Sequence, residues 1–256
     1  MTKKIIGIMG AMPEEIHSIT ELLTNKQETE IGGRTYYVGL LNNIKTIVVF
    51  SRWGKVAAST TLTTLILEFK ITELIFTGVA GAINPSLNIG DIVIAKRLIQ
   101  HDMDARPLVP QFEIPLLGIT YFESPNEKVA KAELIINDLL SKKHLAAVIE
   151  QKDLDNFKIH HPKLFIGDIA SGDKFFANKS EKHKLLSTLP TILCVEMEGA
   201  AVAQVCYEYQ IPFTIIRTIS DTADEKAELD FPSFIKKISS KYSQEIVKLY
   251  YKPEFD

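Results

Sequence analysis

Residues 192–221 read ILCVEMEGAAVAQVCYEYQIPFTIIRTISD, an apolar run, an alanine-rich stretch and a second apolar run. The run at 192–195 predicts a buried strand, and residues 199–209 have the composition and length of a helix. Residues 213–220 predict a second buried strand. Strands that alternate with helices predict a mainly parallel sheet with helices on both of its faces.

The same alternation extends over the rest of the chain. Further strands are predicted at 5–9, 74–77, 91–95 and 164–169, and further helices at 14–23, 57–69, 127–141 and 231–249. Two runs, 36–41 and 45–50, flank Asn42-Asn43, which predicts a hairpin and therefore a mixed sheet. Residues 101–125 and 142–163 are predicted to be loops. We expect one domain over residues 1–256, an α/β fold of three layers, α/β/α, around a twisted mixed sheet.

The charge balance excludes several classes of partner. The 256 residues carry 29 Lys and Arg against 32 Asp and Glu, a formal net charge of −3. A chain so near neutrality predicts no nucleic-acid partner, and no apolar run reaches the roughly 18 residues of a membrane span. Cys194 and Cys206 lie in apolar surroundings and are expected to be reduced thiols in a cytoplasmic protein.

Motifs for cofactors and metals are missing from the sequence. Gly78-Val79-Ala80-Gly81 lets the backbone approach a ligand closely, but it lacks the full Gly-x-Gly-x-x-Gly pattern of dinucleotide sites. Gly54-Lys55 lacks the upstream glycine of a Walker loop. The six histidines include no pair at helical metal-ligand spacing. We therefore expect neither a cofactor nor a metal.

Polar residues interrupt the apolar strand at 213–220. At a period of two, Arg217 and Asp221 share one face with apolar residues. A buried arginine needs a carboxylate or a polar cavity, so Arg217 belongs either to a structural ion pair or to a site. Ser220 and Asp221 close the strand at the end where open α/β sheets bind ligands.

Two further pairs of acids follow predicted strands. Glu196 and Glu198 lie between a strand and an alanine-rich helix, and Glu14-Glu15 follows the first strand. Acids gain stability from the dipole at a helix N-terminus, which is the alternative to a functional role. Because residues around Glu196 and Glu198 are strongly apolar, we expect at least one of these two acids to point into a cavity.

Six motifs occur together in one order along the chain. They are Gly7-Ile-Met-Gly-Ala-Met-Pro-Glu-Glu15, Gly54-Lys-Val-Ala-Ala58, Thr77-Gly-Val-Ala-Gly81, Ser171-Gly-Asp-Lys-Phe-Phe176, Val195-Glu-Met-Glu-Gly-Ala-Ala201 and Arg217-Thr-Ile-Ser-Asp221. Over residues 4–248 the chain resembles the 5′-methylthioadenosine/S-adenosylhomocysteine nucleosidases of the purine nucleoside phosphorylase superfamily. Each motif alone has little specificity, whereas six in this order are specific. The resemblance implies a nucleoside phosphorylase-like fold and an adenine nucleoside as the small-molecule substrate.

The resemblance also implies a chemistry for the polar residues. Enzymes of this family split an N-glycosidic bond through a transition state similar to a ribosyl cation, and water adds to the anomeric carbon. Glu15 is implied to hold or activate the water, with Arg217 nearby. Asp221 is implied to protonate or hydrogen-bond the adenine N7, and Ser220 to orient it. Proton delivery of this kind contributes about 10² to 10⁴-fold to a rate.

The remaining acids are implied to contact the sugar. Glu198 would bind the ribose 2′- and 3′-hydroxyls, and its charge would favour the developing cation. Glu196 would tune or support Glu198, and Met197 would pack on the ribose.

Apolar residues are implied to line the rest of the site. Phe175 would stack on the adenine, and the backbone of Phe176 would read its edge. Met12 and Phe231 would line the sugar and the 5′-thio side. Val79 stands where the family commonly has a small hydroxyl residue, so a hydrogen bond near the ribose is missing.

Two other features depart from the family. Arg52-Trp53 stands where small or aliphatic residues are usual, which brings bulk and a cation towards the loop after the first strand. The polar stretch 144–163 makes the chain roughly twenty residues longer than the bacterial pattern. Both features affect the expected choice of substrate, and neither removes a matched acid.

Competing functions remain open on the sequence. A phosphorylase of this fold needs cations and hydroxyls around a phosphate, whereas this chain has Glu14-Glu15, Phe76 and Val79 at the matching positions. Hydrolysis is therefore favoured over phosphorolysis. Arg52 is the one residue here that could instead support a phosphorylase. A non-catalytic nucleoside-binding module is disfavoured by the three matched acids Glu15, Glu198 and Asp221 and by Arg217. Other adenosine-type substrates, such as 6-amino-6-deoxyfutalosine or 5′-deoxyadenosine, are compatible with the same residues.

The resemblance implies a homodimer, because in family members a loop of the partner commonly closes the 5′ side of the site. The matching segment is expected at 105–117, which is apolar and rich in proline. The alternative for this segment is a solvated loop.

Overall fold

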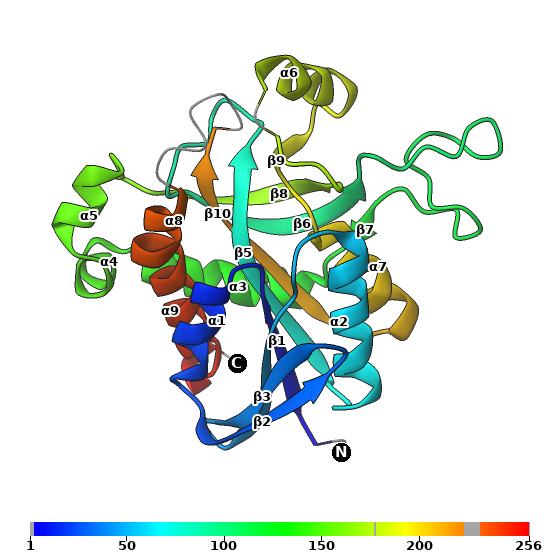
Figure 1. The fold of residues 1–256 in the computed structure, drawn as a ribbon. Coiled ribbons are helices and arrows are strands. Elements are labelled where there is room, and N and C mark those ends of the chain that lie inside the picture. The colour runs from blue at the N-terminus through cyan, green and yellow to red at the C-terminus, as the bar shows by residue number, and fades with distance from the viewer. Residues whose placement is uncertain (1–2, 177, 223–230, 256) are drawn as a thin grey trace.

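The protein is built around one mixed sheet (Figure 1). The structure is a computed structural model that describes residues 3–176, 178–222 and 231–255. Its strands are β1 (Ile5–Gly10), β2 (Thr24–Ile31), β3 (Arg34–Leu41), β4 (Ile44–Phe50), β5 (Glu73–Ala82), β6 (Ile92–Gln100), β7 (Phe122–Glu123), β8 (Leu164–Ser171), β9 (Ile192–Glu196) and β10 (Phe213–Asp221).

Five of these strands close into a ring, which is the part of the fold that carries the site. β5 pairs with β10, β10 with β6, β6 with β8, β8 with β9, and β9 pairs again with β5. β1 leaves the ring from β5 and leads through β4 and β3 to β2 at the edge. Half of the strand pairings in the described ranges are antiparallel, so the sheet is mixed, as the hairpin predicted, rather than mainly parallel.

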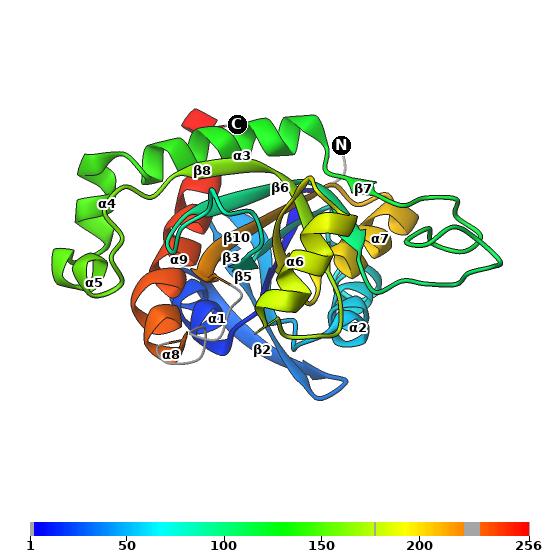
Figure 2. The same cartoon turned by 90° about the horizontal axis from the view of Figure 1, so that it is seen from above.

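Helices cover both faces of the sheet and give the predicted three layers (Figure 2). One face carries α2 (Lys55–Leu67) and α7 (Gly199–Tyr209), and the other carries α1 (Pro13–Thr20), α3 (Asn126–Leu139) and α9 (Ser240–Tyr250). Side chains alternate between these faces along each strand. In β1, for example, Met9 belongs to the first core and Ile8 to the second.

The predicted hairpin of β3 and β4 is confirmed, but the strand beside it, β2, was not predicted. Asn42 and Asn43 both have positive φ, as a two-residue hairpin turn requires, and they join β3 to β4. β2 escaped prediction because Thr24–Ile31 is almost entirely polar and exposed, with no apolar alternation. The predicted helix 231–249 consists of α8 (Phe231–Phe234), a π-helical turn (Ile235–Ser239) and α9.

The prediction of a loop over 142–163 was wrong. This segment forms two short helices, α4 (Lys142–Val148) and α5 (Gln151–Asn156), whose few apolar residues face the second core. Polar helices of six or seven residues have too little periodicity to be recognised from sequence. The other predicted loop, 101–125, is confirmed up to β7 and forms an arm that projects from the sheet (Figures 1 and 2).

Within the described residues, no helix has the length and apolar character needed to cross a lipid bilayer.

Candidate active site

A cavity of about 340 Å³ lies at the carboxyl ends of β1, β5, β9 and β10. Most of the residues predicted for the site line it: Met12, Val79, Phe175, Phe176, Glu196, Met197, Glu198, Ser220, Asp221 and Phe231. Glu15 and Arg217 are fully buried and are absent from this lining. The site therefore has an inner wall of acids and aromatic residues and a second layer of charge behind it.

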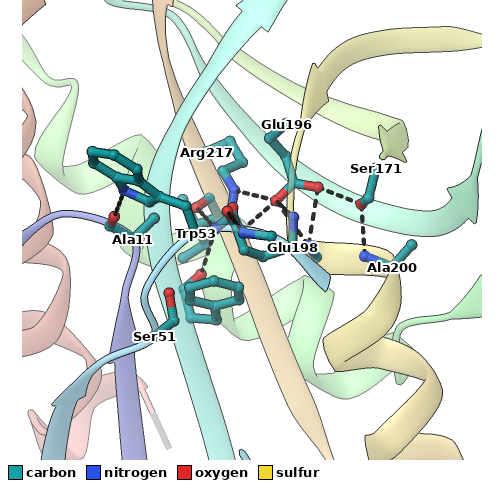
Figure 3. Close-up of polar contacts among 12 residues, drawn as sticks. Ala11, Ser51, Trp53, Ser171, Glu196, Glu198, Ala200 and Arg217 are labelled. Carbon is teal, nitrogen blue, oxygen red and sulfur yellow. Dashed lines mark hydrogen bonds and ion pairs between the residues drawn. The ribbon is translucent and has the colours of Figure 1, made fainter. Parts of the chain in front are cut away.

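The buried arginine of β10 forms an ion pair (Figure 3). Nη2 and Nε of Arg217 donate to Oε2 of Glu196 at 2.7 and 3.2 Å. Nη1 donates to the carbonyls of Phe76 and Ile216, and the guanidinium lies 4.1 Å from the centre of the Phe76 ring. Arg217 therefore forms the ion pair that was one of its two alternatives, and its carboxylate partner also reaches the cavity wall.

The same carboxylate caps the helix that follows it. The amides of Glu198 and Gly199 donate to Glu196 at distances between 2.8 and 3.1 Å, and the Ser171 hydroxyl donates to Oε1 of Glu196. Ser171 Oγ in turn accepts the Ala200 amide at 2.7 Å. The first amides of α7 thus have hydrogen-bond partners. This is the arrangement that the helix-dipole explanation predicts for Glu196.

Close packing around the guanidinium demands glycine on the neighbouring strand. A Cβ on Gly78, the register partner of Arg217, would lie 2.9 Å from the Ala11 Cβ and 3.3 Å from Nη1 of Arg217. This contact explains the glycine of the Thr77–Gly81 motif by packing behind the cavity.

Glu198 is the acid that faces the cavity from the start of α7. Its Oε1 accepts the amide of Gly54 at 2.9 Å, and the side chain is almost completely buried. Burial, followed by the charge of Glu196, raises the pKa of Glu198 to about 7, while Arg217 opposes the rise. The expectation that Glu196 tunes Glu198 agrees with this geometry.

The acid after the first strand lies in the second layer. Glu15, in the first turn of α1, accepts a short hydrogen bond on Oε1 from the Ser239 hydroxyl and a longer one from Ser243 at 3.4 Å. Its Oε2 is buried without a hydrogen-bond partner among the described residues. Burial raises the pKa of Glu15, and the Ser239 bond and the charge of Arg217 oppose the rise.

The end of β10 brings a third acid, Asp221, to the cavity. The Ser220 hydroxyl donates to Oδ2 of Asp221 at 2.7 Å, and both side chains are buried. Asp221 pairs in register with Gly81 of β5, so its carboxylate is positioned by two strands of the ring.

Arg52 and Trp53, the two residues after β4 that depart from the family pattern, contact different parts of the molecule. Trp53 lines the cavity and donates its Nε1–H to the Ala11 carbonyl at 3.1 Å (Figure 3). Arg52, with φ of 61°, instead donates to the Gly33 carbonyl in the β2–β3 turn. The cation that could have favoured a phosphate therefore lies away from the cavity lining.

The family follows from a match that spans almost the whole chain. The model of the phosphorylase superfamily matches residues 5–251. The chain belongs to the phosphorylase superfamily. This superfamily member is 32% identical over 246 residues to a 5′-methylthioadenosine/S-adenosylhomocysteine nucleosidase of Staphylococcus aureus, covering 96% of this chain and 98% of the relative.

Solved structures of other superfamily members are equally similar. A futalosine hydrolase of Helicobacter pylori strain 26695 has a TM-score of 0.82 and 35% identity over 96% of this chain and 97% of its own. A 5′-methylthioadenosine/S-adenosylhomocysteine nucleosidase of S. pneumoniae with a transition-state inhibitor has a TM-score of 0.81 and 31% identity, covering 96% and 98%.

Sequence reasoning missed some residues of this superfamily site. Ser239 lies in the closing helix and was not predicted as a site residue. The one feature of the sequence that marks it is that a small polar residue stands on an apolar face of this helix. Lys174 belongs to a quoted motif, but no role was expected for it at the cavity. Ser171 belongs to the same motif, Ser171–Phe176. Its hydrogen bond to Glu196 spans 25 residues, so no local sequence pattern indicates it.

The raised pKa of Glu198 predicts a pH-dependent effect of Glu198→Gln on stability. Between the ordinary pKa of 4.5 and about 7, the folded state keeps a proton that the unfolded state has released, so the wild type loses stability as pH rises. Glutamine does not titrate, and its Oε1 can still accept the Gly54 amide. The free energy of unfolding of the variant minus that of the wild type should therefore grow by roughly 3 kcal/mol across this interval. Urea titrations at pH 4.5 and 7.5 measure this difference, and a constant difference contradicts the assignment.

Proposed function

We propose that this superfamily member hydrolyses the N-glycosidic bond of 5′-methylthioadenosine and S-adenosylhomocysteine, releasing adenine and the 5′-thioribose product. The observation that carries the proposal is that two buried carboxylates, Glu198 and Asp221, face one apolar cavity from the ends of different strands. The likeness to the S. aureus nucleosidase supports the same reaction.

The two cavity acids have separate roles, Asp221 at the adenine and Glu198 at the sugar. A carboxyl group at Asp221, oriented by Ser220, delivers a proton to N7 of adenine and makes the base a better leaving group. The Glu198 carboxylate accepts the ribose 2′- and 3′-hydroxyls, and its negative charge stabilises the cationic sugar in a site with little water. The aromatic ring of Phe175 supplies a surface on which adenine stacks.

Glu15 is the base for the attacking water in this proposal. One of its oxygens is held by Ser239, which leaves the buried Oε2 as an acceptor for the water. The positive charge of Arg217 favours the ionised form of Glu15, in which it can take up the proton of the water. The products of this step are the hydroxylated ribose carbon and a protonated Glu15, which returns its proton to solvent.

The charge of the cavity supports hydrolysis over phosphorolysis. Lys174 is the sole cation among the described residues of the lining, and its ammonium group is paired with Glu181. A phosphate at this site would meet the negative charge of the Glu198 carboxylate, which repels an anion.

A phosphate-free assay tests the reaction. We expect the protein to release adenine from 5′-methylthioadenosine in phosphate-free buffer, with free methylthioribose as the second product on chromatography. A strict requirement for phosphate, with a ribose 1-phosphate product, would refute hydrolysis.

The choice of 5′ substituent has a second candidate, an adenosine-type substrate such as aminofutalosine or 5′-deoxyadenosine. The H. pylori futalosine hydrolase matches this chain as well as the nucleosidases do. Trp53, which is about two-thirds exposed, adds a large aromatic surface to the cavity. The same chromatographic assay with a panel of these nucleosides ranks the substrates by kcat/KM.

Asp221→Asn should separate chemistry from binding. The amide keeps the shape and the contact with Ser220, but it has no proton to deliver at neutral pH, so kcat should fall by about 10² to 10⁴-fold. Nucleoside affinity, measured by calorimetry, should change little. Unchanged turnover in this variant would remove Asp221 as the acid.

We further propose that the protein is a homodimer in which residues 105–117 of one chain close the 5′ side of the site in the other. Leu108 and Leu116 on this arm are almost fully exposed, which is unusual for leucine side chains that have no partner surface. Light scattering at micromolar concentration should give twice the chain mass of 28.7 kDa. A monomer would refute the dimer.

The proposed cellular role is methionine salvage in the cytoplasm. Cys194 and Cys206 are free and buried, and burial raises the pKa of both thiols, as in a protein of a reducing compartment. Cell fractionation tests the location, and recovery outside the cytoplasm would contradict it.

A further inference from the structure

The two short helices α4 and α5, in the segment longer than the family pattern, pack against the closing helix of the chain. Figures 1 and 2 both show them beside α8 and α9. The rings of Phe157 and Phe234 meet edge to face, with centroids 5.4 Å apart. Apolar residues of the segment, among them Leu145 and Leu154, join Ile235 and Ile238 in the second core. The segment therefore supports the part of the chain that includes the π-helical turn.

One acid of this segment is directed at that turn. Asp153 of α5 is almost completely buried, and Oδ1 lies 3.2 Å from Nζ of Lys237. Its Oδ2 lies 4.0 Å from Nζ of Lys241. The two lysines are four residues apart and therefore lie on one face of the helix.

The opposite face of the same helix holds the proposed base. Ser239 and Ser243, also four residues apart, both donate to Oε1 of Glu15. Because neighbouring residues of an α-helix are rotated by about 100°, the step of two residues from Lys241 to Ser243 in α9 crosses to the other side. The start of α9 is thus held between Asp153 on one side and Glu15 on the other.

We propose that Asp153 is a positioning residue for catalysis: by pairing with Lys237 and Lys241 it fixes the rotation of the closing helix and so places Ser239 on Glu15. The proposal rests on the proposed function of Glu15 as the base for water. A π-helical turn widens the helix at residues 235–239, and such turns occur frequently at functional sites. Lys237, which pairs with Asp153, and Ser239, which donates to Glu15, both lie within this turn.

Among the described residues, few charges surround the two ends of this connection. Asp153 faces Lys237 and Lys241 of the closing helix, with Lys152 on its own helix and Glu150 just before it. Glu15 is influenced by the charge of Arg217 from β10 and by the hydroxyls of Ser239 and Ser243.

Loss of the connection should alter Glu15 in a defined direction. The Ser239 bond lowers the pKa of Glu15, so a helix that rotates away lets this pKa rise. Because the base must be ionised to accept a proton from water, the acid limb of the kcat/KM profile then moves to higher pH.

The test compares Asp153→Asn with Asp155→Asn, the same substitution on the exposed side of α5, where Asp155 contacts Gln151. We expect Asp153→Asn to move the acid limb up by about half a pH unit, a threefold loss of kcat/KM below the limb. Asp155→Asn should leave the profile unchanged. Lys237→Gln, at a half-exposed lysine, should reproduce the shift, and the double variant should add nothing to it, as expected for two residues that act through one contact.

A direct titration separates this proposal from the proposed function. The pKa of Glu15, followed by carboxyl ¹³C NMR and assigned with Glu15→Gln, should rise in Asp153→Asn whatever the activity of the protein. An unchanged pKa and pH profile, together with a lower melting temperature, would show that Asp153 only supports the fold and would overturn the proposal. A wild type that cleaves no nucleoside would refute the proposed function alone, since the NMR titration still decides the positioning role.

Discussion

The arrangement of the site depends on the need to neutralise one buried charge. Arg217 has no exposed surface, and removal of one partner from such a pair costs about 3–5 kcal/mol. Glu196 meets this need and at the same time caps α7, so the strand, the helix start and the neighbouring Glu198 are fixed by one carboxylate. Gly78 is required because a Cβ there would stand 2.9 Å from the Ala11 Cβ and 3.3 Å from the guanidinium.

This pair also sets the electrostatics of the cavity. The negative charge of Glu196 raises the pKa of Glu198, while Arg217 favours the ionised forms of both Glu198 and Glu15. A group of buried acids around a single arginine suits a reaction that generates positive charge on a sugar and needs a base at neutral pH. The same group disfavours a reaction that starts by binding an anion.

Much of the fold and of the inner wall could be predicted from sequence because the signals are local. The strand β10 shows its burial by its apolar run, and the polar residues at its end mark where it meets the cavity. The limits were contacts across long sequence distances: Ser239 meets Glu15 across 224 residues, and no local pattern reports such a pairing. The helices α4 and α5 and the polar strand β2 were missed since their sequences lack the apolar period on which prediction rests. Arg52 and Trp53 were both expected to approach the loop after the first strand, yet Arg52, whose φ is positive, contacts Gly33 and only Trp53 contacts that loop, at Ala11.

The ion pair also limits how this sequence can change over evolutionary time. A buried arginine without its acid, or the acid without its arginine, is a strongly destabilised intermediate, so the two positions cannot be exchanged one at a time. Gly78 is restricted as well, because a Cβ there would stand 2.9 Å from the Ala11 Cβ in addition to meeting the guanidinium. Surface elements such as α4 and α5 are free of this restriction at their exposed positions, which leaves them as places where the chain can be lengthened and make new contacts to the buried interior.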